Sequence, residues 1–182
     1  KQHLELCRDI AQKFNNDFKK ENFLQVPEPL IQKQFSRIMS LKDGSKKMSK
    51  SEISDLSRIN LTDDKDQIIN KIKKAKTDPM PMPKTVSELE ERLEAKNLIG
   101  IYASLTNSNI EKSVESFIGK NFSEFKEKLS EVLVDKIEPI SLEIKKLLND
   151  QTYLNNILQV GAEKANSIAS KKIQNIKEII GF

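Results

Sequence analysis

The sequence predicts a mainly α fold with a small α/β remnant toward its N-terminal end. Of its 182 residues, 32% are charged and 5% aromatic, with five glycines and no tryptophan. This balance is more typical of a helical protein than of a β-sandwich. Apolar residues recur at helical spacing through most of the chain after residue 83. The apolar runs before residue 40 are short and lie beside prolines, which favours brief strands there.

The N-terminal part is predicted to begin with a helix. Apolar residues follow helical spacing over residues 4–18, and the helix can reach Lys19 because the asparagines before it disfavour helix only mildly. Cys7 lies on the apolar face and is expected in the core. Residues 23–26 and 37–39 are then predicted as strands or strand-like loops.

The rest of the chain is predicted to be helical. Residues 62–64, Thr-Asp-Asp, indicate a helix start, since side-chain oxygens cap free amides and acidic groups suit the positive end of the dipole. Three alternating prolines within residues 77–83 must end that helix and form the clearest linker. Pro139 is expected to kink or interrupt a later helix. Helical stripes follow over residues 98–105, 110–118, 125–140 and 154–180.

Charge and apolar content limit the functional classes. The net charge is +4 and the isoelectric point is near 9.0, which permits contact with phosphate or RNA but equally fits solvated lysine faces. No apolar run approaches the roughly 18 residues of a membrane span, and no signal-peptide pattern is seen. One cysteine cannot form an internal disulfide. We therefore expect a cytoplasmic protein without a membrane partner.

One stretch, GSKKMSKSE at residues 44–52, carries a chemical signal. Lys47 and Lys50 place two ammonium groups three residues apart on a predicted loop, with serine hydroxyls between and beside them. Such a loop can follow the charge that builds on pyrophosphate when a nucleophile attacks the α-phosphate, and this accelerates the step. The simpler alternative is a solvated loop.

The surroundings of this loop resemble a known family. Residues 47–51 are the KMSKS signature of class I aminoacyl-tRNA synthetases, and the similarity to tryptophanyl-tRNA synthetases runs from Lys1 to Phe182. The segments that carry it are KQHLEL at 1–6, RIMS at 37–40, RINLTDD at 58–64, KTD at 76–78, NLIGIY at 97–102 and GAEKA at 161–165.

The resemblance implies a domain organisation and a reaction. It assigns residues 1–62 to the C-terminal part of a Rossmann-type catalytic domain that includes the KMSKS loop. It assigns residues 63–182 to an α-helical anticodon-binding domain, and leaves open whether the last helix packs back on the catalytic domain. Such enzymes use ATP, with Mg²⁺ brought by the nucleotide, to join L-tryptophan to tRNA(Trp), and they work as homodimers.

The resemblance also implies roles for individual residues. Ile38 would lie against the adenine through its backbone, and Lys47 and Lys50 would grip the β- and γ-phosphates as the catalytic pair. No metal ligand is assigned. The implied ATP-binding residues are Ile38, Lys47, Met48, Ser49, Lys50 and Ser51. Basic clusters at residues 71–76 and 171–172 are candidates for tRNA phosphates, although lysines at helix ends are also favoured by the dipole.

Several family features are absent from the sequence. The His-Ile-Gly-His-like motif and the segment that recognises indole are not found, so the chain resembles the C-terminal portion of a synthetase of roughly 330 residues and is expected to be inactive alone. Glu52 and Ile53 stand where the family often has Asp-Pro, which predicts a difference in loop mobility. The alternatives are a tyrosyl-tRNA synthetase fragment and a stand-alone helical RNA-binding or adaptor protein.

Overall fold

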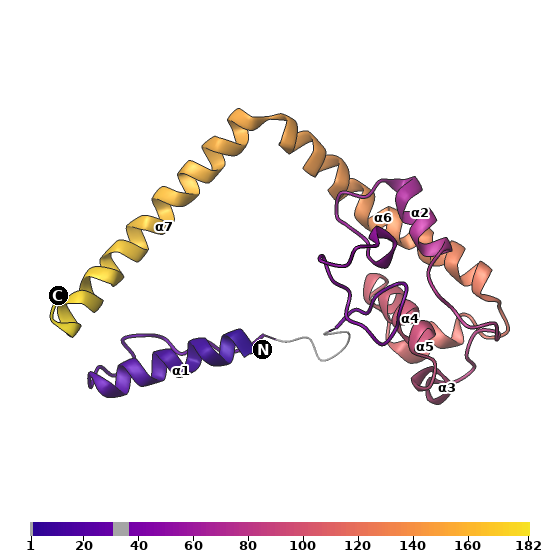
Figure 1. The fold of residues 1–182 in the computed structure, drawn as a ribbon, viewed down its shortest axis with the longest axis horizontal. Helices are drawn as coiled ribbons and strands as arrows, with labels where there is room; N and C mark the ends of the chain where they lie inside the picture. Colours follow the sequence, from indigo (N-terminus) through magenta and orange to yellow (C-terminus); the bar gives the residue numbers. More distant parts are fainter. Residues whose placement is uncertain (1, 31–36) are drawn as a thin grey trace. The chain divides into compact units, whose positions relative to one another are not determined.

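A computed structural model describes residues 2–30 and 37–182. The described part is mainly helical, and its only β pairing is a single antiparallel bridge between Met39 and Lys47. The mainly α prediction is therefore confirmed (Figure 1). The helices are α1 (Gln2–Asp17), the short 3-10 helix η1 (Asp55–Ser57), α2 (Lys65–Lys73), α3 (Val86–Glu90), α4 (Leu93–Leu105), α5 (Ile110–Glu115), α6 (Phe122–Asn149) and α7 (Gln151–Ile180). Lys1, where the family resemblance begins, lies outside the described residues.

The chain divides into two compact units. One, here called the core unit, is Gln34–Asn149, and the other, the outer unit, combines Lys1–Lys33 with Asp150–Phe182.

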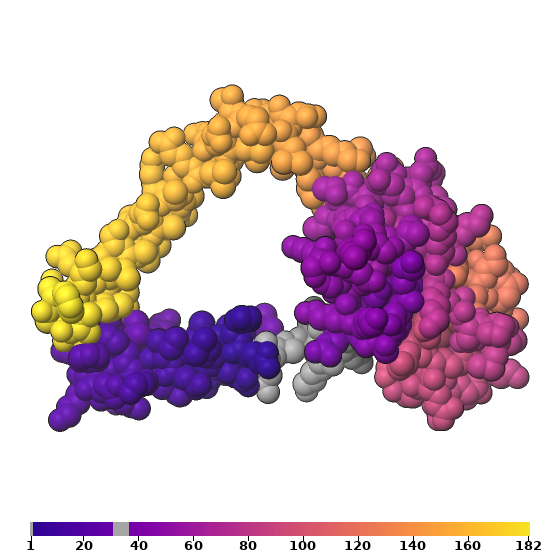
Figure 2. Space-filling model, viewed as in Figure 1, coloured from indigo at the N-terminus to yellow at the C-terminus, as the bar shows by residue number. Residues whose placement is uncertain are grey.

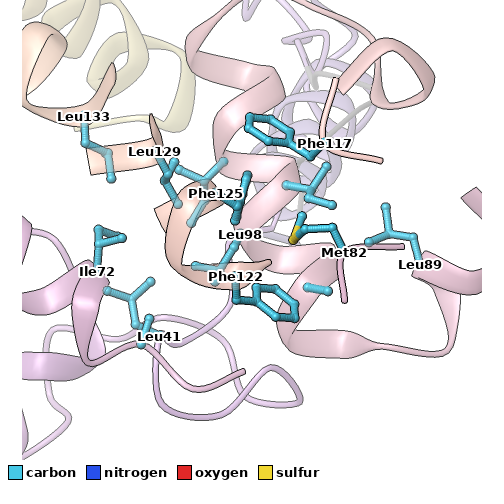
Figure 3. Packing of buried hydrophobic residues seen from close by; sticks show 14 of the residues in the cluster. Leu41, Ile72, Met82, Leu89, Leu98, Phe117, Phe122, Phe125, Leu129 and Leu133 are labelled. Carbon is cyan, nitrogen blue, oxygen red and sulfur yellow. The ribbon is translucent and has the colours of Figure 1, made fainter. Parts of the chain in front are cut away.

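The core unit is built on helix α6. Ile68 and Ile72 of α2 are fully buried, and α2 packs on α6, whose Leu129 and Leu133 are buried. Figure 3 shows Ile72, Leu129 and Leu133 in one cluster with Leu98 of α4 and the aromatic rings of Phe117, Phe122 and Phe125. Leu41, from the segment before the lysine-rich loop, joins the same cluster. The loop therefore starts from a buried residue.

Local sequence signals set the bounds of α2. Asp64 is the N-cap: its side chain accepts from the backbone N–H of Gln67, whose own side chain accepts from the N–H of Asp64. This reciprocal capping box confirms the helix start predicted at residues 62–64. The helix ends before the proline-rich segment, as predicted. Asp78 in that segment pairs with Arg92, which also donates to the carbonyl of Pro81 at 2.8 Å.

Residues 23–26 and 37–39, predicted as strands or strand-like loops, are strand-like loops in the structure. At residues 23–26 the hydrogen bonds of a ladder are taken by a side chain, because Asn15 accepts from the N–H of Leu24 at 2.9 Å and donates to its carbonyl at 2.8 Å. At residues 37–39 only Met39 pairs, in the single bridge to Lys47. An isolated pair of short strands is only marginally stable, and no larger sheet surrounds these segments in the described part of the chain.

The interruption expected at Pro139 does not occur. Helix α6 continues through Pro139 to Asn149, and α7 passes through Gly161. Proline removes one backbone donor. Pro139 and the preceding turn at Asp135 are exposed, so the freed carbonyl can bond to water.

The outer unit buries little of its apolar surface. In α1 only Ala11 is buried, and α7 has no buried residue. Figure 2 shows the orange-to-yellow helix α7 open along much of its length. Cys7 is exposed, so its expected place in a core is wrong: the helical face was identified correctly, but little packs on it. Helix α1 ends at Asp17, short of the predicted limit at Lys19, which has a positive φ of 50°.

Candidate functional site

The lysine-rich loop closes on a short pair of antiparallel segments. The N–H of Ser40 donates to the carbonyl of Lys46 at 2.8 Å, and the N–H of Met48 donates to the carbonyl of Ile38 at 3.0 Å. Asp43 shapes the turn between them by accepting from both the backbone and the hydroxyl of Ser45. The structure thus places the Ile38 carbonyl beside Met48 of the signature, while the ATP-binding roles of these residues stay predictions.

Asn97 of α4 holds this pair from the other side. Its side-chain carbonyl accepts from the N–H of Met39 at 2.9 Å, and its amide nitrogen donates to the carbonyl of Met39 at 2.8 Å. One amide side chain therefore satisfies both backbone polar groups of one residue, as a neighbouring strand would do. Asn97 has no role predicted from the sequence, because a partner 58 residues away leaves no local signal.

The start of α4 also contacts the turn. A Cβ added at Gly44 would lie 2.7 Å from the carbonyl carbon of Leu93 and 2.8 Å from the nitrogen of Glu94, so only glycine fits without movement. Lys76 lies 2.8 Å from the Glu94 carboxylate. Its hydrogen bond lowers the pKa of Glu94, with a further contribution from the N–H of Gly44. These contacts hold the turn against α4.

The tip of the loop, residues 47–51, is bound mainly to itself. The hydroxyls of Ser49 and Ser51 are 2.9 Å apart, and the N–H of Ser51 donates to the Ser49 hydroxyl at 3.3 Å. Met48 packs against the core cluster, whereas Lys47 and Lys50 are exposed. No carboxylate of residues 2–30 or 37–182 forms an ion pair with either lysine. Two ammonium groups are therefore available for an anionic ligand.

Arg58 holds the segment that follows the tip. It donates to the backbone carbonyls of Glu52 at 2.9 Å and Ser54 at 3.5 Å, and its guanidinium lies 3.0 Å from the Asp55 carboxylate. Glu52 directly follows the signature pentapeptide. The anchoring therefore reaches the first residue after the tip.

A buried ion cluster lies behind Arg58. Lys71 of α2 is 2.6 Å from a carboxylate oxygen of Asp55 and 2.6 Å from one of Asp63. The side chains of Lys71 and Asp63 are each 4% exposed, while that of Asp55 is 52% exposed. Hydrogen bonds from Lys71 and Asn60 lower the pKa of Asp55 and keep it ionised.

This cluster revises the basic patch expected at residues 71–76. Lys71 is buried and fully engaged, so it is not available to tRNA phosphates. Lys76 is exposed and paired with Glu94, whereas Lys73 and Lys74 lie on the surface. In the outer unit, Lys172 donates to the carbonyl of Phe23 and lies 3.6 Å from the centroid of its ring.

Two features of the described residues bear on other functional classes. Across residues 2–30 and 37–182, no three His, Cys, Asp or Glu side chains are grouped in a way that could hold a metal ion. None of the helices found in these ranges is both long and apolar enough to cross a bilayer.

Comparison with known proteins assigns the family. The model for "tRNA synthetases class I (W and Y)" matches residues 1–138. A tryptophan–tRNA ligase of Caulobacter vibrioides is 50% identical over all 182 residues, which correspond to 53% of its length. One of Rickettsia felis is also 50% identical over the whole chain, which covers 54% of that protein. The chain therefore spans about half the length of the curated relatives it matches.

Solved structures agree with the sequence comparison. The tryptophanyl-tRNA synthetase of Mycoplasma pneumoniae superposes with a TM-score of 0.80 at 27% identity, over the whole chain and 53% of that structure. The Campylobacter jejuni synthetase complexed with ADP and tryptophan gives a TM-score of 0.66 at 26% identity, over the whole chain and 54% of that structure. The chain belongs to the class I tRNA synthetase family of the tryptophan and tyrosine enzymes.

Proposed function

We propose that this chain supplies the ATP-closing loop and the tRNA-binding part of a tryptophan–tRNA ligase. The observation that carries the proposal is the pair Lys47 and Lys50: both are exposed and without a carboxylate partner in the described part of the chain, on a loop whose two ends are fixed. The complete reaction needs residues beyond those of this chain, which alone is expected to activate nothing.

The chemistry follows from the loop. A carboxylate oxygen of L-tryptophan attacks the α-phosphorus of ATP, a new P–O bond forms, and the bond to the bridging oxygen breaks to release pyrophosphate. Lys47 and Lys50 stabilise the charge that develops on that leaving group, and they do so most strongly in the transition state. Ser49, Ser51 and the loop amides add donors. Mg²⁺ would arrive with the nucleotide and would offset part of the negative charge of its phosphates.

The base of the loop is suited to the nucleoside. The Ile38 carbonyl accepts one hydrogen bond, from Met48, and retains a second lone pair. The exocyclic amine of adenine can donate a hydrogen bond to that lone pair. The Ile38 side chain, 44% exposed, offers an apolar surface beside it.

The remaining assignments belong to the same proposal. Residues 1–62 form the end of the catalytic domain and residues 63–182 the helical domain that meets the anticodon arm of tRNA(Trp). The complete enzyme acts in the cytoplasm as a homodimer. The relatives named above are tryptophan–tRNA ligases, which favours this function over a tyrosine enzyme or a free-standing RNA-binding adaptor.

The proposal is tested by ATP–pyrophosphate exchange with the protein encoded by the longest open reading frame that contains residues 1–182. Tryptophan should drive exchange and tyrosine should not. Lys47→Ala and Lys50→Ala should each lower kcat roughly 100-fold, the range for removing one transition-state donor. Lys46→Ala is the matched control, because Lys46 is a neighbouring exposed lysine that pairs with Asp43. Full exchange in the Lys47 and Lys50 variants would overturn the role of the loop.

A further inference from the structure

We propose that Asp55 and Lys71 are positioning residues that fix the segment after the KMSKS tip to helix α2 and thereby set the reach of Lys50. The inference rests on the proposed function, since it concerns how the same loop is held. Neither residue belongs to the signature, and neither touches the tip directly.

Asp55 lies between the segment after the loop and helix α2. One of its carboxylate oxygens accepts from Asn60 at 2.9 Å and lies 3.0 Å from the guanidinium of Arg58. Its other oxygen lies 2.6 Å from the ammonium of Lys71. One side chain thus joins the segment after the loop to the last turn of α2.

Lys71, to which Asp55 is joined, lies in a rigid part of the core unit. Lys71 lies between Ile68 and Ile72 in sequence, and both isoleucines are fully buried where α2 packs on α6. Asp63 also binds Lys71 and accepts from the backbone N–H of Asn60 at 2.8 Å. The ammonium therefore has a fixed place in the core unit.

The charges of the cluster balance. Asp55 and Asp63 carry two negative charges, and Arg58 and Lys71 carry two positive charges. A buried lysine needs one ionic partner to avoid an unpaired charge, and Asp63, equally buried, provides it. Asp55 is half-exposed and is not required for that purpose. Its contribution is to connect Arg58 with the buried pair.

Arg58 links this cluster to the catalytic Lys50. Arg58 donates to the carbonyl of Glu52, two residues after Lys50. When Asp55 loses its charge, Arg58 loses its ionic partner and the segment from Glu52 onward is less firmly held. Lys50 then reaches the leaving group less often in the right geometry. Small displacements of a positioned group have large rate effects.

The test uses Asp55→Asn in the protein of the longest open reading frame that contains residues 1–182. This variant keeps the size of a half-exposed side chain and should fold. We expect kcat for ATP–pyrophosphate exchange to fall roughly tenfold or more, with the KM for ATP changed less than about twofold, because the contact matters in the transition state. Lys71→Met should give the same division between kcat and KM with a larger loss.

Asp78→Asn is the matched control. Asp78 also forms an ion pair with a partly buried arginine in the core unit, but that pair holds the proline-rich segment rather than the loop. It should lower thermal stability without changing kcat. Equal kcat losses in Asp55→Asn and Asp78→Asn would overturn the inference, since they would reflect general destabilisation.

A second measurement is independent of activity. Tryptic cleavage after Lys47 and Lys50 should be several-fold faster in Asp55→Asn than in the parent or in Asp78→Asn, because a loosened segment opens more often. Unchanged cleavage together with unchanged kcat overturns the inference. If Lys47→Ala abolishes exchange in the same protein, the proposed function nevertheless stands. If Lys47→Ala has no effect, the proposed function fails, and the cleavage rates still decide whether Asp55 fixes the segment.

Discussion

The core unit and the outer unit share helical patterning but differ in what covers their apolar faces. Every member of the main buried cluster lies within Gln34–Asn149. In the outer unit α7 buries none of its residues, and Ile157, Ile168 and Ile173 are at least half exposed. Apolar periodicity therefore identifies a helix without revealing what packs against it. The contrast predicts that stability is concentrated in the core unit.

The largest expected effect is the loss of a core aromatic ring. Phe125 is fully buried, and its ring centroid lies 4.8 Å from that of Phe117. Phe125→Ala should lower the free energy of unfolding of the core unit by about 3–5 kcal/mol. Ile168→Ala on the exposed α7 should change stability by less than about 0.5 kcal/mol.

Amide hydrogen exchange read by mass spectrometry separates these two effects. In Phe125→Ala, peptides from α4 and α6 should exchange faster, while the exchange of α7 should stay as in the parent. A loss of protection in Ile168→Ala as large as that in Phe125→Ala would show that α7 is packed as firmly as the core unit, against the comparison.

Two glycines sharpen the comparison with a smaller effect. Gly44→Ala places a Cβ within 3 Å of the backbone of Leu93 and Glu94, and the strain should cost about 1–3 kcal/mol. Gly161 lies inside α7 with nothing within 4 Å of an added Cβ. Gly161→Ala should therefore be stabilising by about 0.5–1 kcal/mol through helix propensity.

Urea unfolding followed by circular dichroism gives both values. The parent chain provides the reference slope, and changes in midpoint at constant slope report stability. If Gly44→Ala is neutral, the turn is free to move away from α4, and the contact is not a fixed support of the loop.

The features that could be predicted from sequence are the local ones. The helix start at Asp64 and the break at the proline-rich segment depend on neighbours within a few residues, and both were predicted. The KMSKS loop was identified because its signature is contiguous. The role of Asn97 was not predicted, because its partner Met39 lies 58 residues away. Lys71 was a candidate for tRNA phosphates within the cluster at residues 71–76, since the two carboxylates that pair with it approach it only in the folded chain.

The smallest expected effect is a pH dependence of the core unit. The hydrogen bond from Lys76 lowers the pKa of Glu94 below its usual value of 4.5. A carboxylate with a depressed folded pKa stabilises the protein above the unfolded pKa, and this stability is lost as pH falls through the folded pKa. Stability measured by urea unfolding should therefore decrease on acidification below about pH 4.5.

Glu94→Gln isolates this contribution. The variant should be less stable than the parent near neutral pH by at most about 1 kcal/mol, as for a pair whose lysine is exposed, and the difference should shrink below pH 4.5. Lys76→Met should have the same effect, because it removes the first cause of the shift. Asp78 also has a lowered pKa: burial opposes the shift, but the hydrogen bonds from Arg92 and Met80 outweigh it. Some acid sensitivity should therefore remain in Glu94→Gln, and its complete disappearance would mean that Glu94 alone sets the acid response.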